Sequence, residues 1–492
     1  MRILVLVVVL LLGARPCVAA GEGQDAAVLG EVRGVYERLE LPDGERMGLV
    51  GLGLRHAFSD VFSMGIGSWM AVDGDRGGFI TLGLDGALRY GVTDRVAVET
   101  GLFVGAGGGR GGYTLSGGGL MLRTHGALLY DVGAAGRVGA GVSYVNFPSG
   151  GAIESVQPFL VYSLPFESSV RNSWDRAGAY GCERSPHSLA VVVRDIHVPS
   201  SAETDSGGRQ EDVTLLGVEW RTYFGESWYA KFETEGAAGG NSTGYMQILV
   251  GGGVRVPLAE RLYLTADAAV GGAGGGNVDT GGGVVVDGSG GLEYFLTSRL
   301  FAGVAGGYLA ALDGSFEGGS LGLKFGYQSA GRGVAGDEAG WMPTCFRVRG
   351  VHQSYVKAAD GWRSHHADQE VHNLGVQFDA FLTDEWYLTG QGIAAYDGDA
   401  GAYMIGLVGS GVRWPVAGDL FVDAEGLLGA AGGGGLAMGS GLVGQGSIGI
   451  GYELSPSLEV LGSVGRLEAF DGEFKANVIG VSVGYLFTTS LL

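Results

Sequence analysis

The stretch SGVRWPVAGDLFVDAE, residues 410–425, has two runs of alternating apolar residues joined by a short turn. Two further copies occur, GGVRVPLAERLYLTAD at residues 252–267 and GALRYGVTDRVAVETG at residues 86–101. Every copy predicts a β-hairpin. An arginine lies near the end of the first strand in each of them, as Arg89, Arg255 and Arg413. A hairpin that recurs three times indicates a chain built from internal repeats.

The three hairpins belong to three copies of a larger unit. We place the units at residues 31–166, 187–328 and 345–487, with linkers at 167–186 and 329–344. Each unit supports eight strands, whose connections alternate between tight turns and longer loops. This rhythm predicts an antiparallel up-and-down meander, because neighbouring strands joined by short turns must run in opposite directions.

One face of each predicted strand is bulky and apolar, and the other is small. In the last strand, Ile479, Val481 and Val483 alternate with Gly480 and Ser482. A soluble sandwich would place many Lys, Glu and Thr residues on its water-facing side. Since the second face here is mostly Gly, Ala and Ser, the pattern favours bulky residues facing lipid and small residues facing a narrow interior.

The start of the chain predicts export. Residues 1–20, MRILVLVVVLLLGARPCVAA, have an early arginine, an apolar core and small residues up to Ala20, which is typical of a cleaved secretory signal peptide. The chain has 98 glycines in 492 residues and a formal net charge of -21, and this acidity disfavours nucleic acid as a partner. We therefore expect an exported, glycine-rich β protein.

These features resemble those of bacterial outer-membrane β-barrel proteins as a class. The resemblance rests on the signal peptide, the alternating strands, the aromatic residues near strand ends such as Trp228 and Trp386, and the terminal pattern Val483–Phe487. The chain departs from that class by continuing past Phe487 to Leu492. The resemblance implies a transmembrane antiparallel β-barrel in a Gram-negative outer membrane, with membrane lipid and the β-barrel assembly machinery as partners.

Two architectures fit three units of eight strands. Eight strands close a barrel that side chains can fill, whereas 24 strands would enclose a wide lumen. A wide barrel usually needs a plug, and only about ten residues separate the signal peptide from the first unit. Inward positions such as Phe103, Met121 and Leu129 are too apolar to line water. We therefore favour three tandem barrels, with one 24-stranded barrel as the alternative.

Charged residues recur on the face that we assign to the interior. The arginine of each repeated hairpin, and one arginine on each opening strand, have candidate partners on the neighbouring strand, which are Glu99, Asp267 and Glu425 in the three units. The expected interior network contains Arg33, Arg89, Glu99, Arg194, Arg255, Asp267, Arg349, Arg413 and Glu425. A selectivity ring or an anion site is the functional alternative. We favour a structural network, because a buried guanidinium without a partner is costly.

No motif marks a catalytic, cofactor or metal site. Serine and histidine occur together at His56 with Ser59 and at His125 with Ser143, but no G-x-S-x-G elbow marks a nucleophile. Beyond the signal peptide the cysteines are Cys182 and Cys345. In an oxidising periplasm they could bond to each other or to another molecule, and the sequence leaves both pairings open.

The expected function is a structural or surface-interaction role exerted by the outer loops on a ligand that the sequence does not identify. Three of these loops carry glycine-rich tips, at residues 105–119, 271–283 and 429–441. A porin-like channel for small solutes is the alternative. A lipid-modifying outer-membrane enzyme comes third, and we expect that the protein is not an enzyme and needs no cofactor.

Overall fold

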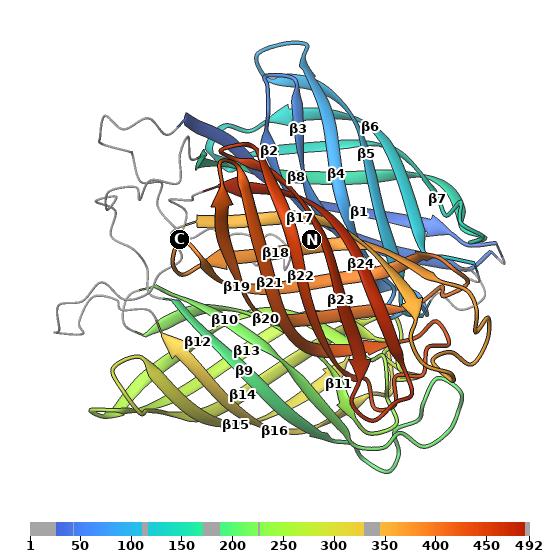
Figure 1. Cartoon of the computed structure of the whole chain (residues 1–492), viewed down its shortest axis with the longest axis vertical. Helices are drawn as coiled ribbons and strands as arrows, with labels where there is room; N and C mark the ends of the chain where they lie inside the picture. The colour runs from blue at the N-terminus through green and yellow to red at the C-terminus, as the bar shows by residue number, and fades with distance from the viewer. Residues whose placement is uncertain are drawn as a thin grey trace.

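Figure 1 shows a computed structural model that describes residues 26–42, 44–110, 117–170, 187–224, 227–328 and 345–487. The strands form three closed barrels of eight, and the first strand of each barrel pairs with its last. The prediction of three barrels is therefore confirmed, and the single 24-stranded barrel is wrong. The predicted signal peptide lies outside the described residues. No helix in the described ranges is long and apolar enough to cross a membrane.

Barrel 1 is coloured blue to teal in Figure 1. Its strands are β1 (Ala26–Glu40), β2 (Arg46–Ala57), β3 (Phe62–Asp73), β4 (Ile80–Gly91), β5 (Val96–Gly108), β6 (Leu120–Asp131), β7 (Arg137–Asn146) and β8 (Glu154–Val170). A short 3-10 turn, Gly133–Ala135, joins β6 to β7. All neighbours are antiparallel, and β1 closes the barrel on β8.

Barrel 2 is coloured green to yellow and lies at the bottom of the view in Figure 1. Its strands are β9 (His187–His197), β10 (Val213–Phe224), β11 (Trp228–Gly239), β12 (Met246–Ala259), β13 (Leu262–Gly274), β14 (Val284–Phe295), β15 (Leu300–Ala311) and β16 (Glu317–Gln328). The pairing of β9 with β16 closes this barrel.

Barrel 3 is coloured orange to red and lies between the other two in that view. Its strands are β17 (Cys345–Lys357), β18 (Val371–Phe381), β19 (Trp386–Asp397), β20 (Met404–Ala417), β21 (Leu420–Gly432), β22 (Leu442–Ser455), β23 (Leu458–Ala469) and β24 (Lys475–Phe487). The pairing of β17 with β24 closes it. In all three barrels, tight turns gather at one end and longer connections at the other.

Successive residues of each strand face alternately the barrel interior and the outer wall. In β24, Ile479 and Val481 are 53 % and 55 % exposed, while Val478 and Ser482 are buried. The interior is less uniformly small than the sequence suggested. Towards the long loops it holds large residues such as Trp69 in barrel 1. The glycines make room for them, since a Cβ on Gly51 would lie 2.7 Å from the Trp69 ring.

The barrels contact one another through a repeated loop contact. The loop after the third strand of each barrel packs on the loop after the fifth strand of another. Gly77 N–H in barrel 1 donates to Gly281 O in barrel 2 at 2.8 Å. Thr243 Oγ1 in barrel 2 donates to Gly439 O in barrel 3 at 2.7 Å. The β19–β20 loop of barrel 3 returns to barrel 1, where Ala402 bridges to the end of β5. The three contacts form a closed ring.

Glycine permits this close approach of backbones. A Cβ on Gly432 would lie 2.3 Å from Gly244 Cα, and a Cβ on Gly78 would lie 2.3 Å from the backbone of Gly274. Real Cβ atoms do not approach other heavy atoms so closely. The glycine-rich tips therefore face neighbouring barrels along much of their described length, and this corrects the expectation that they are free binding surfaces.

Apolar and charged contacts add to the ring. Met70 and Met404, from barrels 1 and 3, are buried in one cluster that Met246 of barrel 2 packs against. Arg110 of barrel 1 lies 3.0 Å from Asp205 in the β9–β10 loop of barrel 2. Burial raises the pKa of Asp205 to about 6, so this ion pair is complete only above that pH.

We expect Gly432→Val to destabilise the protein by about 1–3 kcal/mol, because the new side chain collides with the backbone of another barrel. The matched control is Gly288→Val, on β14, where an added Cβ meets nothing within 4 Å. Thermal unfolding of the detergent-refolded protein measures both. Equal midpoints for the two variants would show that the loop contact contributes nothing to stability.

Candidate functional site

The barrel interiors gather most of the buried charges. In barrel 1, Arg89 Nη2 donates to Glu99 at 2.7 Å and to Glu31 at 2.8 Å. Arg33 and Arg55 also contact Glu99. This carboxylate is fully buried and faces three guanidinium groups, which compensate for the loss of its hydration.

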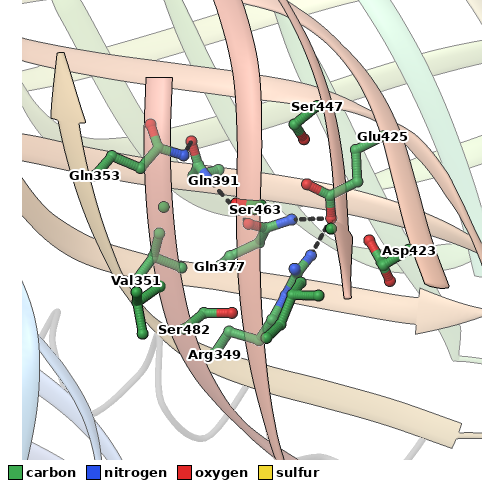
Figure 2. Close-up of a pocket in the computed structure, with 14 residues that line it drawn as sticks. Arg349, Val351, Gln353, Gln377, Gln391, Asp423, Glu425, Ser447, Ser463 and Ser482 are labelled. Carbon is green, nitrogen blue, oxygen red and sulfur yellow. Dashed lines mark hydrogen bonds and ion pairs between the residues drawn. The ribbon is translucent and has the colours of Figure 1, made fainter. Parts of the chain in front are cut away.

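Barrel 3 builds a comparable cluster around different residues. Figure 2 shows Arg349 and Gln377 converging on Glu425, and Gln377 Nε2 donates to that carboxylate at 2.9 Å. Arg347 donates to Asp379 and to Glu459, both at 2.6 Å. The cluster combines nearly complete burial with paired charge, as a stable interior requires.

Barrel 2 also has an extensive set of interior ion pairs. Lys231 Nζ donates to Asp267 at 2.5 Å, and Arg221 donates to Glu293 at 2.6 Å. Lys324 donates to Glu219 at 2.6 Å. Arg194 bonds to three acidic residues, namely Glu233, Glu235 and Asp287. The pairs come from strands on different sides of the barrel, so they tie its walls together.

Two expected pairings are wrong. Arg255 donates to Gln328 at 2.6 Å and not to Asp267, and Arg413 bonds to Glu453 and not to Glu425. The register explains both cases. Arg89 lies directly opposite Glu99, but Arg255 lies opposite Thr265, and Arg413 lies opposite Asp423. Asp267 and Glu425 are two residues farther along their strands, a displacement of about 6.6 Å.

The placement of Arg194 also differs from the sequence alignment. Arg33 pairs in register with Gly53 and Ser163, and Arg349 pairs with Gln377 and Gly484. The residue of barrel 2 at that position is Ala190, whereas Arg194 lies four residues farther along β9. Arg194 therefore matches Glu37 of barrel 1 in register. The opening-strand arginines do not form one repeated set.

Sequence reasoning missed several interior charges, including Arg55, Arg123, Arg221, Lys231 and Arg347. A signal was present for two of them. Arg55 and Arg221 occupy the same place when the second strands are aligned, in Leu54–His56 and Trp220–Thr222, and both lie on the inward face. Recurrence on the inward face is thus a better guide to the interior than recurrence within the hairpin alone.

Positions equivalent in register carry opposite charges in different barrels. Glu31 lies opposite Arg55 in barrel 1, and Arg347 lies opposite Asp379 in barrel 3. A second position shows the same exchange across the lumen. Arg123 donates to Glu37 at 2.8 Å in barrel 1, while Arg194 donates to Asp287 at 2.9 Å in barrel 2.

The corresponding pair in barrel 3 is uncharged and consists of Gln353 and Gln445. A polar cavity nearby has a volume of ≈ 20 Å³, room for about one water molecule. Figure 2 shows side chains from several strands crowding this space. Barrels 1 and 2 therefore keep an ion pair with the signs exchanged, and barrel 3 has no charge at either position, which is expected of a structural interior.

The serine and histidine pairs do not form a nucleophile. Ser143 Oγ donates to Glu37 at 2.7 Å, while His125 contacts Arg123 and Glu99. His56 packs against aromatic rings at the contact between barrels 1 and 3, among them Phe487 at 4.9 Å between ring centroids. These geometries supply no serine activated by a histidine.

Neither cysteine prediction is tested. Cys345 is buried at the start of β17, in a cluster with Phe381 and Leu486. Cys182 lies outside the described residues. Among the residues that the structure describes, no group of three His, Cys, Asp or Glu side chains is arranged to hold a metal ion.

No protein-family model and no curated protein matches the chain. Its structural neighbours are bacterial outer-membrane β-barrel proteins, the class that the sequence resembles. They include the siderophore receptor PirA from Acinetobacter baumannii, with a TM-score of 0.27, 10 % identity, and coverage of 95 % of this chain and 81 % of that one. Another is OccK11 (OpdR) from Pseudomonas aeruginosa, with a TM-score of 0.21, 11 % identity, and coverage of 94 % and 95 %. Scores this far below 0.5 carry nothing further about this chain.

We expect Arg123→Gln to cost about 3–5 kcal/mol, because it leaves Glu37 buried without its guanidinium partner. The double variant Glu37→Gln/Arg123→Gln reproduces the uncharged pair of barrel 3 and should cost less than the single change. Urea unfolding of the folded protein measures both free energies. A double variant as unstable as the single one would mean that the ion pair is not the source of the loss.

Proposed function

We propose that the protein is an outer-membrane protein whose three barrels span the bilayer side by side. The supporting observation is the chemistry of the outer walls. Large apolar side chains cover them and are more than one-third exposed. On barrels 2 and 3 they include Leu292, Leu321, Leu323, Phe325, Ile448, Ile450, Val464, Ile479 and Val481. Soluble monomers rarely expose apolar surface on this scale, whereas lipid-facing barrel walls require it.

Aromatic residues support the same orientation. Trp228, Trp386 and Trp414 lie near the tight turns, and each is more than half exposed on the outer wall. Aromatic rings at that level are typical of the girdle where a barrel meets the membrane–water boundary. These rings support an orientation with the tight turns at one membrane surface and the longer loops at the other.

The role that the interiors favour is structural or surface-interacting, and not transport. Paired charges fill much of each interior from the tight-turn end, and in barrels 1 and 2 they extend towards the long loops at Glu37–Arg123 and Arg194–Asp287. Apolar clusters close the end near the long loops. In barrel 3, Trp362 stacks on Phe474 at 5.8 Å in this apolar cluster. A barrel of eight strands has little lumen left once such side chains are in place.

The β17–β18 connection is one of the long loops that the ring of barrels does not use. It is anchored by Trp362, whose Nε1 donates to Ala367 O at 2.6 Å, and by Arg363, which donates to Gly398 O at 2.9 Å. The same loop holds Asp360 and Asp368 almost fully exposed. Lys357 Nζ lies 3.0 Å from Asp360 and 3.5 Å from Asp368, so the loop is a fixed, exposed surface of mixed charge.

We expect the refolded mature chain to show no stable single-channel conductance in planar bilayers, because its barrels are filled. Vesicle flotation and heat-modifiable gel mobility serve as controls for insertion. A large, stable conductance from inserted protein would overturn the structural role and support the porin-like alternative.

We expect Leu323→Arg to destabilise the protein folded in lipid vesicles by about 2–4 kcal/mol, because an arginine near the middle of β16 would face the acyl chains. Leu312→Arg is the matched control. Leu312 is also 63 % exposed but lies in the loop after β15, where the change should stay within about 0.5 kcal/mol. Urea unfolding measures both. Equal effects would mean that water, and not lipid, surrounds the wall.

A further inference from the structure

The outer wall of barrel 3 carries a groove. The residues at the equivalent places on barrels 1 and 2 have a different chemistry. The groove lies over β22, β23 and β24, on the side of barrel 3 that faces the viewer in Figure 1, and has a volume of ≈ 550 Å³. The wall is recessed at Gly446, which has no side chain, and an added Cβ there would meet nothing within 4 Å. Ile448, Val464 and Ile479 form its apolar part. This shape and chemistry suit an acyl chain.

The end of the groove nearer the long loops is basic. Arg466 faces outward between Gly446 and Asn477, and Lys475 faces outward opposite Glu468. Arg466 Nε donates to Glu468 at 2.8 Å and Nη1 donates to Asn477 at 3.0 Å, and neither bond uses Nη2. The Arg466 side chain is 38 % exposed. Two cations beside one carboxylate leave a net positive spot on a strongly acidic protein.

The equivalent positions of the other barrels have a different chemistry. By register, Arg466 and Lys475 correspond to Tyr144 and Glu154 in barrel 1. They correspond to Tyr308 and Glu317 in barrel 2. Tyr144 Oη donates to Glu154 at 2.9 Å, and Tyr308 bonds to Glu317 in the same way. Barrel 3 has therefore replaced a tyrosine–glutamate pair with two cations at this level.

We infer that this groove binds one lipid with an anionic phosphate headgroup. Its acyl chain lies along Gly446, Ile448, Val464 and Ile479, and its phosphate lies against Arg466 and Lys475. Arginine and lysine both recognise phosphate, and a basic cluster at the membrane surface attracts anionic lipid. The site rests on the proposed membrane placement, because only lipid would reach both the apolar wall and the basic end.

The test uses full-length mature protein in detergent, titrated with phosphatidylglycerol or with zwitterionic phosphatidylcholine, and bound lipid is counted by native mass spectrometry. The principal variant is Arg466→Tyr/Lys475→Glu, which reproduces the residues of barrels 1 and 2 and should therefore fold. We expect at least tenfold weaker binding of phosphatidylglycerol to this variant, with phosphatidylcholine binding unchanged.

Two further variants separate the headgroup from the acyl chain. Gly446→Leu fills the groove without changing charge and should also weaken phosphatidylglycerol binding. Tyr144→Arg/Glu154→Lys in barrel 1 should add a basic end to that barrel and raise the number of bound lipids. We expect weaker phosphatidylglycerol binding to the first variant and a larger number of bound lipids on the second.

Flotation with vesicles distinguishes failure of the proposed membrane placement from failure of the proposed lipid site. Protein that does not float would overturn the membrane placement, and the lipid site with it. Protein that floats, but whose principal variant binds phosphatidylglycerol as tightly as the unaltered chain, would overturn the site alone.

Discussion

An eight-stranded barrel leaves an interior only wide enough for its own side chains, and the rest of this structure follows from that limit. Each interior position must be filled, and each buried charge must find a partner within reach. Glu99 in barrel 1 meets both demands, because it is fully buried and contacts Arg33, Arg55 and Arg89. The same limit leaves large side chains to fill the end of each interior near the long loops.

The constraint acts on pairs and not on single residues. Glu37 with Arg123, and Arg194 with Asp287, occupy equivalent positions with the charges exchanged, and barrel 3 has two glutamines there. In each pair the two formal charges either cancel or are both absent. An interior whose charges can change sign between repeats is poorly suited to selecting one ion, so the exchange agrees with a structural role.

Glycine has two distinct uses in this chain. Inside the barrels it makes room for large neighbours, as Gly51 does for Trp69. Between the barrels it lets backbones meet, as Gly432 does against Gly244. Because the loops after the third and fifth strands are used in the ring of barrels, the surface left for other molecules is the outer wall and the remaining long loops. The outer wall is also where barrel 3 differs in chemistry from its two neighbours, at Arg466 and Lys475.

The sequence by itself determined the repeat and the strand periodicity, and it favoured three closed barrels over one. The pairing of the first with the last strand in each unit decided that choice. Alternation within a strand and recurrence between units are local properties, and residues such as Ile479 and Ser482 carry them without reference to the fold. The tertiary structure alone decided which charges meet. A displacement of two residues separates Arg255 from Asp267, and Glu37 reaches Arg123 only across the lumen. It also decided that the glycine-rich tips face other barrels. Partners across a lumen, or on another barrel, depend on register and on packing, and neither is contained in the spacing of residues along one strand.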